Sequence, residues 1–386
     1  MKYRNIITFF CLFVLTFFVY GLLSFHRNPG FDHFKQMSRS LLKGNLYLPD
    51  SARNYQDTVI YNEKAYMPFP VVPAIILIPF QNNFIDLNQQ QMGIIIGSLN
   101  TALLFLLLLK NASYKKSLLI SLFYAFGTVA FWSTNIGTVW NYALIVSVFF
   151  LLLSLISHFH KKHFLSGLFL ALAAFSRYPV LCAGLFYVLE LLKDKKNFVK
   201  FLWGVSFFVP IFISYNYLRF GKPFETGYFN VYQYYIQNGF QTNFLQHLDL
   251  KFGNLNYLDI RNIPLHLFTF FFMPPEITRE LLIRPSPFGM GIIFTSPLLL
   301  LAFIPPFNSF QKKILVGFSA IALIDFLHYS QGWVQFGYRF ALDFLPFLLI
   351  LLSLKIKINK LSIILLIISM LVCVWGTYYD FRFGLL

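Results

Sequence analysis

The feature of this sequence that most restricts its fold is a series of apolar segments separated by short polar turns. A helix needs about 20 largely apolar residues to cross the hydrocarbon core of a bilayer. Hydropathy marks eleven candidate spans, at 5–25, 92–109, 117–133, 141–157, 164–176, 178–192, 198–217, 288–306, 314–329, 340–354 and 361–378. The sequence therefore predicts an all-α, polytopic membrane protein with about 11 transmembrane helices, in a single membrane domain over residues 1–386.

Composition excludes other classes of protein. Hydrophobic residues make up 57% of the chain and charged residues only 12%, whereas soluble domains carry about 25% charged residues. These values argue against a soluble, disordered or coiled-coil chain. The apolar run 5–25 is longer than that of a signal peptide, and no A-x-A-like site follows it, so we expect a retained first helix. Residues 70–80 are short and interrupted by prolines, which favours a re-entrant or interfacial segment.

The basic residues predict the orientation in the membrane. Many of the 31 lysines and arginines, mostly lysines, lie in short connections that fall on one side when the spans alternate. Such residues mark the cytoplasmic side, so we expect the N-terminus inside and the C-terminus outside a bacterial cytoplasmic membrane. The long segments 26–69 and 218–287 are then extracytoplasmic. The net charge of +16 is explained as a topology signal, and no basic stripe indicates nucleic-acid binding.

The first outer segment, 26–69, predicts an amphipathic helix that begins near Asp32 and ends at Gly44. Its residues recur at helical spacing, with Phe34, Met37 and Leu41 on one face and Lys35, Arg39 and Lys43 on another. We expect this helix to lie on the membrane surface with its basic face toward lipid phosphates. Asp32 has two compatible interpretations, as the N-cap of the helix and as a carboxylate held at the mouth of the bundle to take a proton. His33, beside it, is more typical of a solvated histidine than of a ligand.

Other polar residues have structural as well as functional interpretations. Three further carboxylates of the first outer segment, Asp50, Asp57 and Glu63, lack metal-ligand spacing. Asp343 follows Arg339 by four residues, the spacing of a helical ion pair. The run 228–238 combines tyrosines with amides, which suits sugar binding and also an interfacial helix. Aromatic residues at span ends are typical of interfacial anchors: Trp132, Trp140, Trp333 and Tyr378.

Four stretches together resemble the glycosyltransferases of the GT-C superfamily, which use lipid-linked sugars. They are the segment from Phe31 to Tyr47, the segment from Tyr66 to Pro73, SYNYLRFGKPFETGY from Ser214 to Tyr228, and GWVQFGYRF from Gly332 to Phe340. Each stretch is short, but their order and their common outward placement strengthen the resemblance. The double proline of the family is replaced here by Val71-Val72-Pro73, and we expect no large soluble C-terminal domain.

The resemblance implies an enzyme, a hexosyl- or pentosyltransferase similar to bacterial mannosyltransferases of the cell envelope. It would move a sugar, with inversion, from a polyprenyl-phosphate donor to a glycan, lipid or protein acceptor at the extracytoplasmic face. Asp32 would act as general base. Three outward arginines, Arg177, Arg219 and Arg339, are expected to bind the donor phosphate, because a guanidinium can contact it through two N–H groups. The expected substrate cavity contains His33, Tyr66, Pro68, Pro70, Tyr228, Trp333 and Asp343. No metal ligand is assigned and no cofactor is certain, although a divalent metal is compatible with such an enzyme.

Two other functions fit parts of the sequence. A lipid-sugar flippase or secondary transporter would also be multi-pass, but transporters often contain internal repeats and midplane charges, and no clear repeat is visible here. An O-antigen ligase or polymerase-like enzyme would share the outward arginines. That alternative gives no reason for the Asp32 segment to lie so close to the first span.

Overall fold

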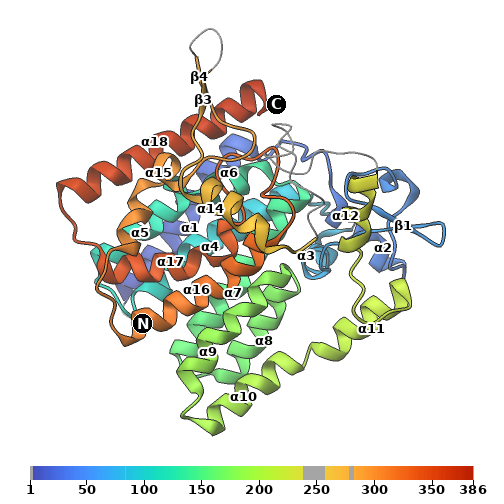
Figure 1. Ribbon diagram of the computed structural model, residues 1–386, viewed down its shortest axis with the longest axis horizontal. Coiled ribbons are helices and arrows are strands. Elements are labelled where there is room, and N and C mark those ends of the chain that lie inside the picture. The colour runs from blue at the N-terminus through green and yellow to red at the C-terminus, as the bar shows by residue number, and fades with distance from the viewer. Residues whose placement is uncertain (1–2, 83, 238–256, 278–281, 386) are drawn as a thin grey trace.

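The computed structural model describes residues 3–82, 84–237, 257–277 and 282–385, and these are mostly helical (Figure 1). The α-helices are α1 (Tyr3–Ser24), α2 (His33–Leu42), α3 (Val72–Leu77), α4 (Gln89–Leu108), α5 (Tyr114–Gly127), α6 (Val129–Ile136), α7 (Val139–Phe159), α8 (His163–Ala174), α9 (Gly184–Leu191), α10 (Lys195–Ser206), α11 (Val209–Phe220), α12 (Tyr228–Gln237), α14 (Ile263–Phe271), α15 (Ile292–Thr295), α16 (Ser309–Leu327), α17 (Ala341–Lys355) and α18 (Lys360–Phe383).

Short 3-10 helices and two hairpins complete the fold. The 3-10 helices are η1 (Asp50–Ala52), η2 (Ile78–Phe80), η3 (Tyr178–Ala183), η4 (Ile260–Asn262) and η5 (Pro297–Phe303). Strands β1 (Val59–Tyr61) and β2 (Lys64–Tyr66) pair antiparallel with Val59 opposite Tyr66, and β3 (Glu276–Ile277) pairs with β4 (Ile283–Arg284). Parts of the predicted second outer segment, 238–256 and 278–281, lie outside the described residues.

Five helical segments are long and apolar enough to cross a membrane: α1, α4, α7, α18 and the continuous stretch Lys195–Phe220 that contains α10 and α11. A sixth is added if α5 and α6, which meet at a 51° bend, form one span. The fold is therefore compatible with a membrane protein. The predicted span 314–329 coincides with the continuous 19-residue helix α16, which is not among these five segments. The remaining predicted spans coincide with shorter or broken helices, of which α15 and η5 are the most fragmented.

The core of the molecule lies around α17, which runs between α16 and the α4–α7 layer (Figure 1). Every residue of α17 from Ala341 to Ser353 is buried, which explains why its sequence is apolar on all faces. By contrast α1 exposes large apolar side chains such as Val14, Phe18 and Leu22 along one face. An exposed apolar face of this kind is what a helix beside lipid would present.

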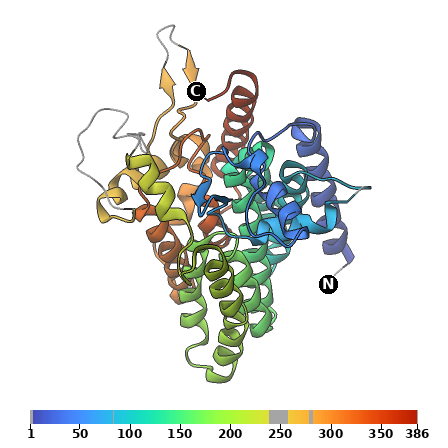
Figure 2. The ribbon, with the colours of Figure 1, turned by 90° about the vertical axis from the view of Figure 1, so that its right-hand side faces the viewer.

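Helices α8, α9 and α10 form an arm that extends from this core (Figures 1 and 2). The backbones of α8 and α10 approach closely at two glycines. A Cβ atom added to Gly167 would lie 2.1 Å from the carbonyl oxygen of Phe201, and one added to Gly204 would lie 2.1 Å from that of Phe164. Small residues allow such close packing of apolar helices. From the tip of the arm, α10 and α11 lead back to α12.

Helix α2, the β1–β2 hairpin and α12 gather at one end of the molecule, at the right of Figure 1. We call this the loop end. The expected position of α2 is wrong in one respect, because Phe34 and Met37 are fully buried inside the protein rather than laid on a membrane surface. Its basic face also has partners within the protein, since Lys35 and Arg39 both form ion pairs with Asp86.

The structure also locates the proline-interrupted segment 70–80 and the aromatic residues predicted to be interfacial anchors. Residues 72–80 form the short helices α3 and η2, and Val72 to Ala74 are buried in the protein. Trp132 is not an interfacial anchor, because its indole is buried and its Nε1–H donates to the Asp380 carboxylate at 2.7 Å. Tyr378, in contrast, is 63% exposed on α18.

Candidate active site at the loop end

Asp32 lies immediately before α2, as the sequence predicts, but its carboxylate does not cap the helix backbone. It accepts a hydrogen bond from the Tyr55 hydroxyl at 2.9 Å and from the Gln36 amide nitrogen at 3.2 Å. Burial, followed by the bond to Asp32, raises the pKa of Tyr55 to about 12, so this phenol remains a donor at neutral pH. Two neutral donors thus hold an accessible carboxylate in a fixed position.

His33 is fully buried under the aromatic side chains of this loop, so the expectation of a solvated histidine is wrong. Its Nε2 lies 2.9 Å from the carbonyl oxygen of Gln56, and its ring contacts those of Tyr55 and Phe69. Burial lowers the pKa of His33 to about 4. The imidazole is therefore neutral at pH 7 and packs beneath the site.

Asp57 occupies the centre of the loop end. Its Oδ2 accepts from the indole Nε1–H of Trp140 at 2.7 Å, and its Oδ1 accepts from the hydroxyl of Tyr235. The residue adopts a left-handed backbone conformation with φ of 65°. Burial raises the pKa of Asp57, against the opposing effects of both hydrogen bonds and of the Arg339 charge. One carboxylate thereby joins the first outer segment, the start of α7 and α12.

A series of aromatic ring contacts links the residues that hold Asp32 and Asp57. The ring of Phe31 packs edge-to-face against Tyr55, the donor to Asp32, with a centroid distance of 5.9 Å. The same ring packs at 5.9 Å against Trp140, the donor to Asp57. Asp32 and Asp57 are therefore held by neighbouring members of one rigid cluster.

Arg339 reaches this cluster from the loop that precedes α17. The buried Gln335 shapes that loop, because its amide nitrogen donates to the carbonyls of Phe288 and Gln331 and its oxygen accepts from the backbone N–H of Arg339. The Arg339 guanidinium lies 5.6 Å from the ring centroid of Trp140, and one of its nitrogens donates weakly to the Trp333 carbonyl at 3.3 Å. Its buried Nε has no hydrogen-bond partner, and no carboxylate among the described residues lies within ion-pair distance.

Arg177 has a different environment. Its guanidinium binds Asp343 through two nitrogens, at 2.8 and 3.0 Å, and lies 3.5 Å from Asp325. The predicted pair between Arg339 and Asp343 is therefore wrong, because the chain fold offers Asp343 the closer Arg177. This cluster lies in the protein interior, where the start of η3, α16 and α17 meet. We expected Arg177 to bind the donor phosphate, but Asp343 and Asp325 are its partners in the structure.

Arg219, the third arginine expected at the phosphate, is buried at the end of α11. It donates at 2.7 Å to the carbonyl of Met67 and at 2.7 Å to the side chain of Asn216, and it lies over the ring of Tyr215. These bonds attach α11 to the chain segment that leads into α3. Two of its five N–H donors are used in these bonds, and its buried Nε has no hydrogen-bond partner.

The remaining expected cavity residues surround this group without forming one pocket. Tyr66 packs against Phe220, Tyr228 packs against Phe69 and Tyr178, and Trp333 packs against Phe288. Pro68 and Pro70 are buried in the segment between β2 and α3. The structure thus brings Asp32 and His33 to the loop end, and Arg339 reaches it at Trp140. Arg219 borders the loop end through Met67 and Phe220, whereas Asp343 belongs to a separate cluster with Arg177.

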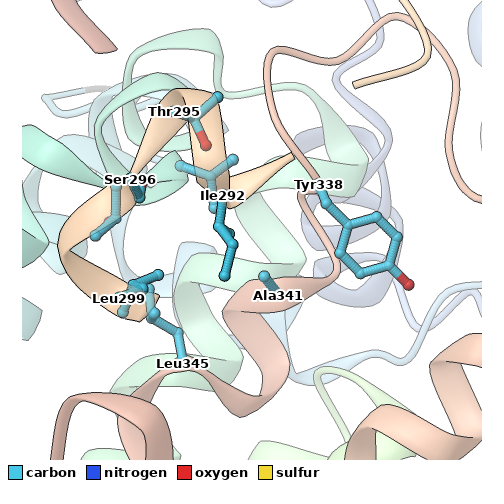
Figure 3. A pocket seen from close by; sticks show the side chains of 9 residues that line it. Ile292, Thr295, Ser296, Leu299, Tyr338, Ala341 and Leu345 are labelled. Carbon is cyan, nitrogen blue, oxygen red and sulfur yellow. The ribbon is translucent and has the colours of Figure 1, made fainter. Parts of the chain in front are cut away.

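Two recesses lie outside this group. A cavity of about 10 Å³ between α15, η5 and α17 has room for one water, and Figure 3 shows Ile292 and Leu299 facing Ala341 and Leu345 across it. Sugar-sized ligands need several hundred Å³. An open recess of about 380 Å³ is lined by Leu46 and apolar residues of α11. Among the described residues, no group of three or more His, Cys, Asp or Glu could hold a metal ion.

Comparison with known proteins adds no family assignment. The chain matches no model of a known protein family, and a search of curated proteins also finds no match.

Sequence reasoning missed Asp57, Trp140 and Tyr235 as a unit. Asp57 lies 83 residues from Trp140 and 178 residues from Tyr235 in the chain, so no local spacing links them. The sequence favours Trp140 first as an anchor at a span end, and nothing local connects it to Asp57. The one local signal is that Asp tolerates left-handed backbone better than most residues do.

Proposed function

We propose that this protein is an integral-membrane glycosyltransferase of the GT-C type. It transfers a sugar from a polyprenyl-phosphate donor to an acceptor hydroxyl at the extracytoplasmic face. The observation that carries the proposal is the loop end, where the positioned Asp32 carboxylate lies in the same cluster as Arg339, a buried arginine without an ion-pair partner among the described residues. The four family-like stretches support it, because two of them supply Asp32 and Arg339.

Asp32 is the general base in this proposal. Its carboxylate takes the proton of the acceptor hydroxyl while the acceptor oxygen attacks the anomeric carbon of the donor. The bond between that carbon and the phosphate oxygen breaks, and the phosphate leaves with the electron pair as polyprenyl phosphate. One displacement of this kind inverts the anomeric configuration. Tyr55 and Gln36 orient the carboxylate and leave lone pairs for the acceptor.

Arg339 is the phosphate ligand in this proposal. The leaving phosphate gains negative charge as the bond breaks, and a fixed guanidinium stabilises that charge. Arg339 has more unused donors than Arg177 or Arg219, because it makes a single long hydrogen bond, at 3.3 Å to the Trp333 carbonyl. Arg177 binds two carboxylates, and Arg219 makes two hydrogen bonds of 2.7 Å. The buried Nε–H of Arg339 lacks a partner, and the proposal assigns it to a phosphate oxygen.

The direct test replaces the base. Asp32→Asn keeps the size of the side chain but removes its ability to take a proton, so we expect kcat to fall roughly 100- to 10,000-fold. The donor is first identified as the lipid-linked sugar that accumulates in a deletion strain. Transfer is then measured with purified protein in detergent, where a flippase or transporter would produce no glycosylated product.

A matched control is available on the same loop. Asp50 is exposed in η1, so Asp50→Asn should retain wild-type turnover. Retention of wild-type turnover by Asp32→Asn, in protein that elutes and melts normally, would disprove the role of Asp32 as base.

A further inference from the structure

Asp57 is a second, half-buried carboxylate of the loop end that the proposed displacement does not use. We infer that Asp57 binds hydroxyl groups of the donor sugar, beside the phosphate held by Arg339. This inference rests on the proposed function and adds to it the residue that recognises the transferred sugar. Asp57 contacts substrate in this scheme but takes no proton from the acceptor.

The hydrogen bonds of Asp57 leave room for a ligand. An ionised carboxylate has about four acceptor positions, and the indole of Trp140 and the hydroxyl of Tyr235 are its two hydrogen-bond donors among the described residues. Both donors fix the plane of the carboxylate while each oxygen keeps a lone pair. Sugar hydroxyls are donors of the kind that such a carboxylate binds.

The backbone at Asp57 supports a functional interpretation. Its φ of 65° is uncommon for a residue with a Cβ atom. Such conformations persist where surrounding contacts enforce them, and they are frequent at ligand sites. The contacts here are those of Trp140 and Tyr235, whose hydrogen bonds hold both oxygens of the half-buried carboxylate in place.

The position of Asp57 relative to Arg339 fits a sugar phosphate. Trp140 touches both residues, with its Nε1 at 2.7 Å from Asp57 Oδ2 and its ring centroid at 5.6 Å from the Arg339 guanidinium. A phosphate on Arg339 would therefore place its attached sugar ring near Asp57. Asp32 joins the same cluster through the contact of Tyr55 with Phe31 and of Phe31 with Trp140, so the proposed base belongs to the group of side chains that holds Asp57.

The experiment distinguishes the contribution of the sugar to binding from that of the phosphate. Binding of undecaprenyl phosphate, and of a panel of undecaprenyl-phosphate hexoses and pentoses, is measured on purified full-length protein in detergent. For wild type, we expect one glycosylated probe to bind more tightly than the bare phosphate. Asp57→Asn should reduce this gain roughly 10- to 100-fold while binding of the bare phosphate is kept. Arg339→Gln should weaken both kinds of probe.

The variant is chosen to preserve the fold. Asn adopts left-handed backbone readily, and its amide oxygen can still accept from Trp140. Asp50→Asn, on the same loop, should bind every probe as wild type does. The ratio of the two affinities is the decisive readout, because a general loosening of the site lowers both affinities together.

Each outcome has a defined meaning. If Asp57→Asn loses both probes equally, Asp57 is only a counter-ion or packing residue, and the inference is overturned. If it keeps the full preference for the glycosylated probe, the inference is also overturned, whereas the proposed function stands. If wild type binds no probe, or binds all probes equally, the proposed function fails and the sugar subsite fails with it.

Discussion

At the scale of single residues, the three candidate arginines differ in what remains of their hydrogen-bonding capacity. A guanidinium has five N–H donors. Arg177 uses its donors on Asp343 and Asp325. Arg219 makes two short hydrogen bonds, to Met67 and Asn216, and its buried Nε has no partner. Arg339 has one long hydrogen bond, to the Trp333 carbonyl, and a buried Nε without a partner. Residue type could not separate these cases, because the partners come from distant parts of the chain.

His33 gives a residue-scale prediction about pH. Its pKa is about 4 in the folded protein and about 6.5 when unfolded, so the unfolded state binds the proton more tightly. Its contribution to stability is complete above pH 6.5 and is lost as the pH falls toward 4. Between pH 7 and 4.5 this loss is about 2.5 kcal/mol. His33→Gln should therefore show a smaller decrease in Tm over this interval than wild type, in detergent-solubilised protein.

The control for this prediction is the exposed His26. His26→Gln should leave the wild-type dependence of Tm on pH unchanged, because His26 is exposed and the variant leaves the buried His33 in place. An equal decrease in Tm for wild type and His33→Gln would show that His33 does not control acid stability.

At the scale of elements, the arm depends on the contact between α8 and α10. A Cβ atom at Gly167 would overlap the backbone of Phe201, which a side-chain rotation cannot relieve. Gly167→Ala should therefore force the helices apart and destabilise the protein by about 1–3 kcal/mol, seen as a lower Tm. The Tm in detergent measures this effect.

Gly21 provides the opposite expectation. It lies within α1, and a Cβ atom there would meet nothing within 4 Å. Alanine favours a helix over glycine by about 1 kcal/mol, so Gly21→Ala should leave Tm unchanged or raise it. If Gly167→Ala were equally harmless, the α8–α10 contact would be looser than the structure indicates.

At the scale of the whole molecule, the orientation predicted from charge places the loop end outside the cell. In a background without the three native cysteines, Asp50→Cys tests the loop end and Lys195→Cys tests the tip of the arm, and both positions are exposed. A membrane-impermeant maleimide should label Asp50→Cys in intact cells and Lys195→Cys only after permeabilisation. The reverse pattern would invert the topology and remove the basis for an extracytoplasmic reaction.

The sequence predicts the long helices well, because α1, α4, α7 and α18 are continuous apolar runs whose lengths match a bilayer. It predicts the broken regions less well, since Pro297 and the bend after Gly127 interrupt runs that hydropathy treats as continuous. Asp32 could be found from its local pattern and its resemblance. Asp57 could not be found in this way, because its hydrogen-bond donors, Trp140 and Tyr235, are distant in the chain and meet it only in the tertiary fold.

The contacts of α18 have a consequence for biosynthesis. Trp132 lies 248 residues before Asp380, and Arg27, which lies just after α1, has its guanidinium 3.6 Å from the ring centroid of Phe381. Neither contact can form until the ribosome has synthesised α18. The indole of Trp132 therefore lacks its carboxylate partner through most of translation, and this side of the core closes only when α18 packs onto α5 and α6.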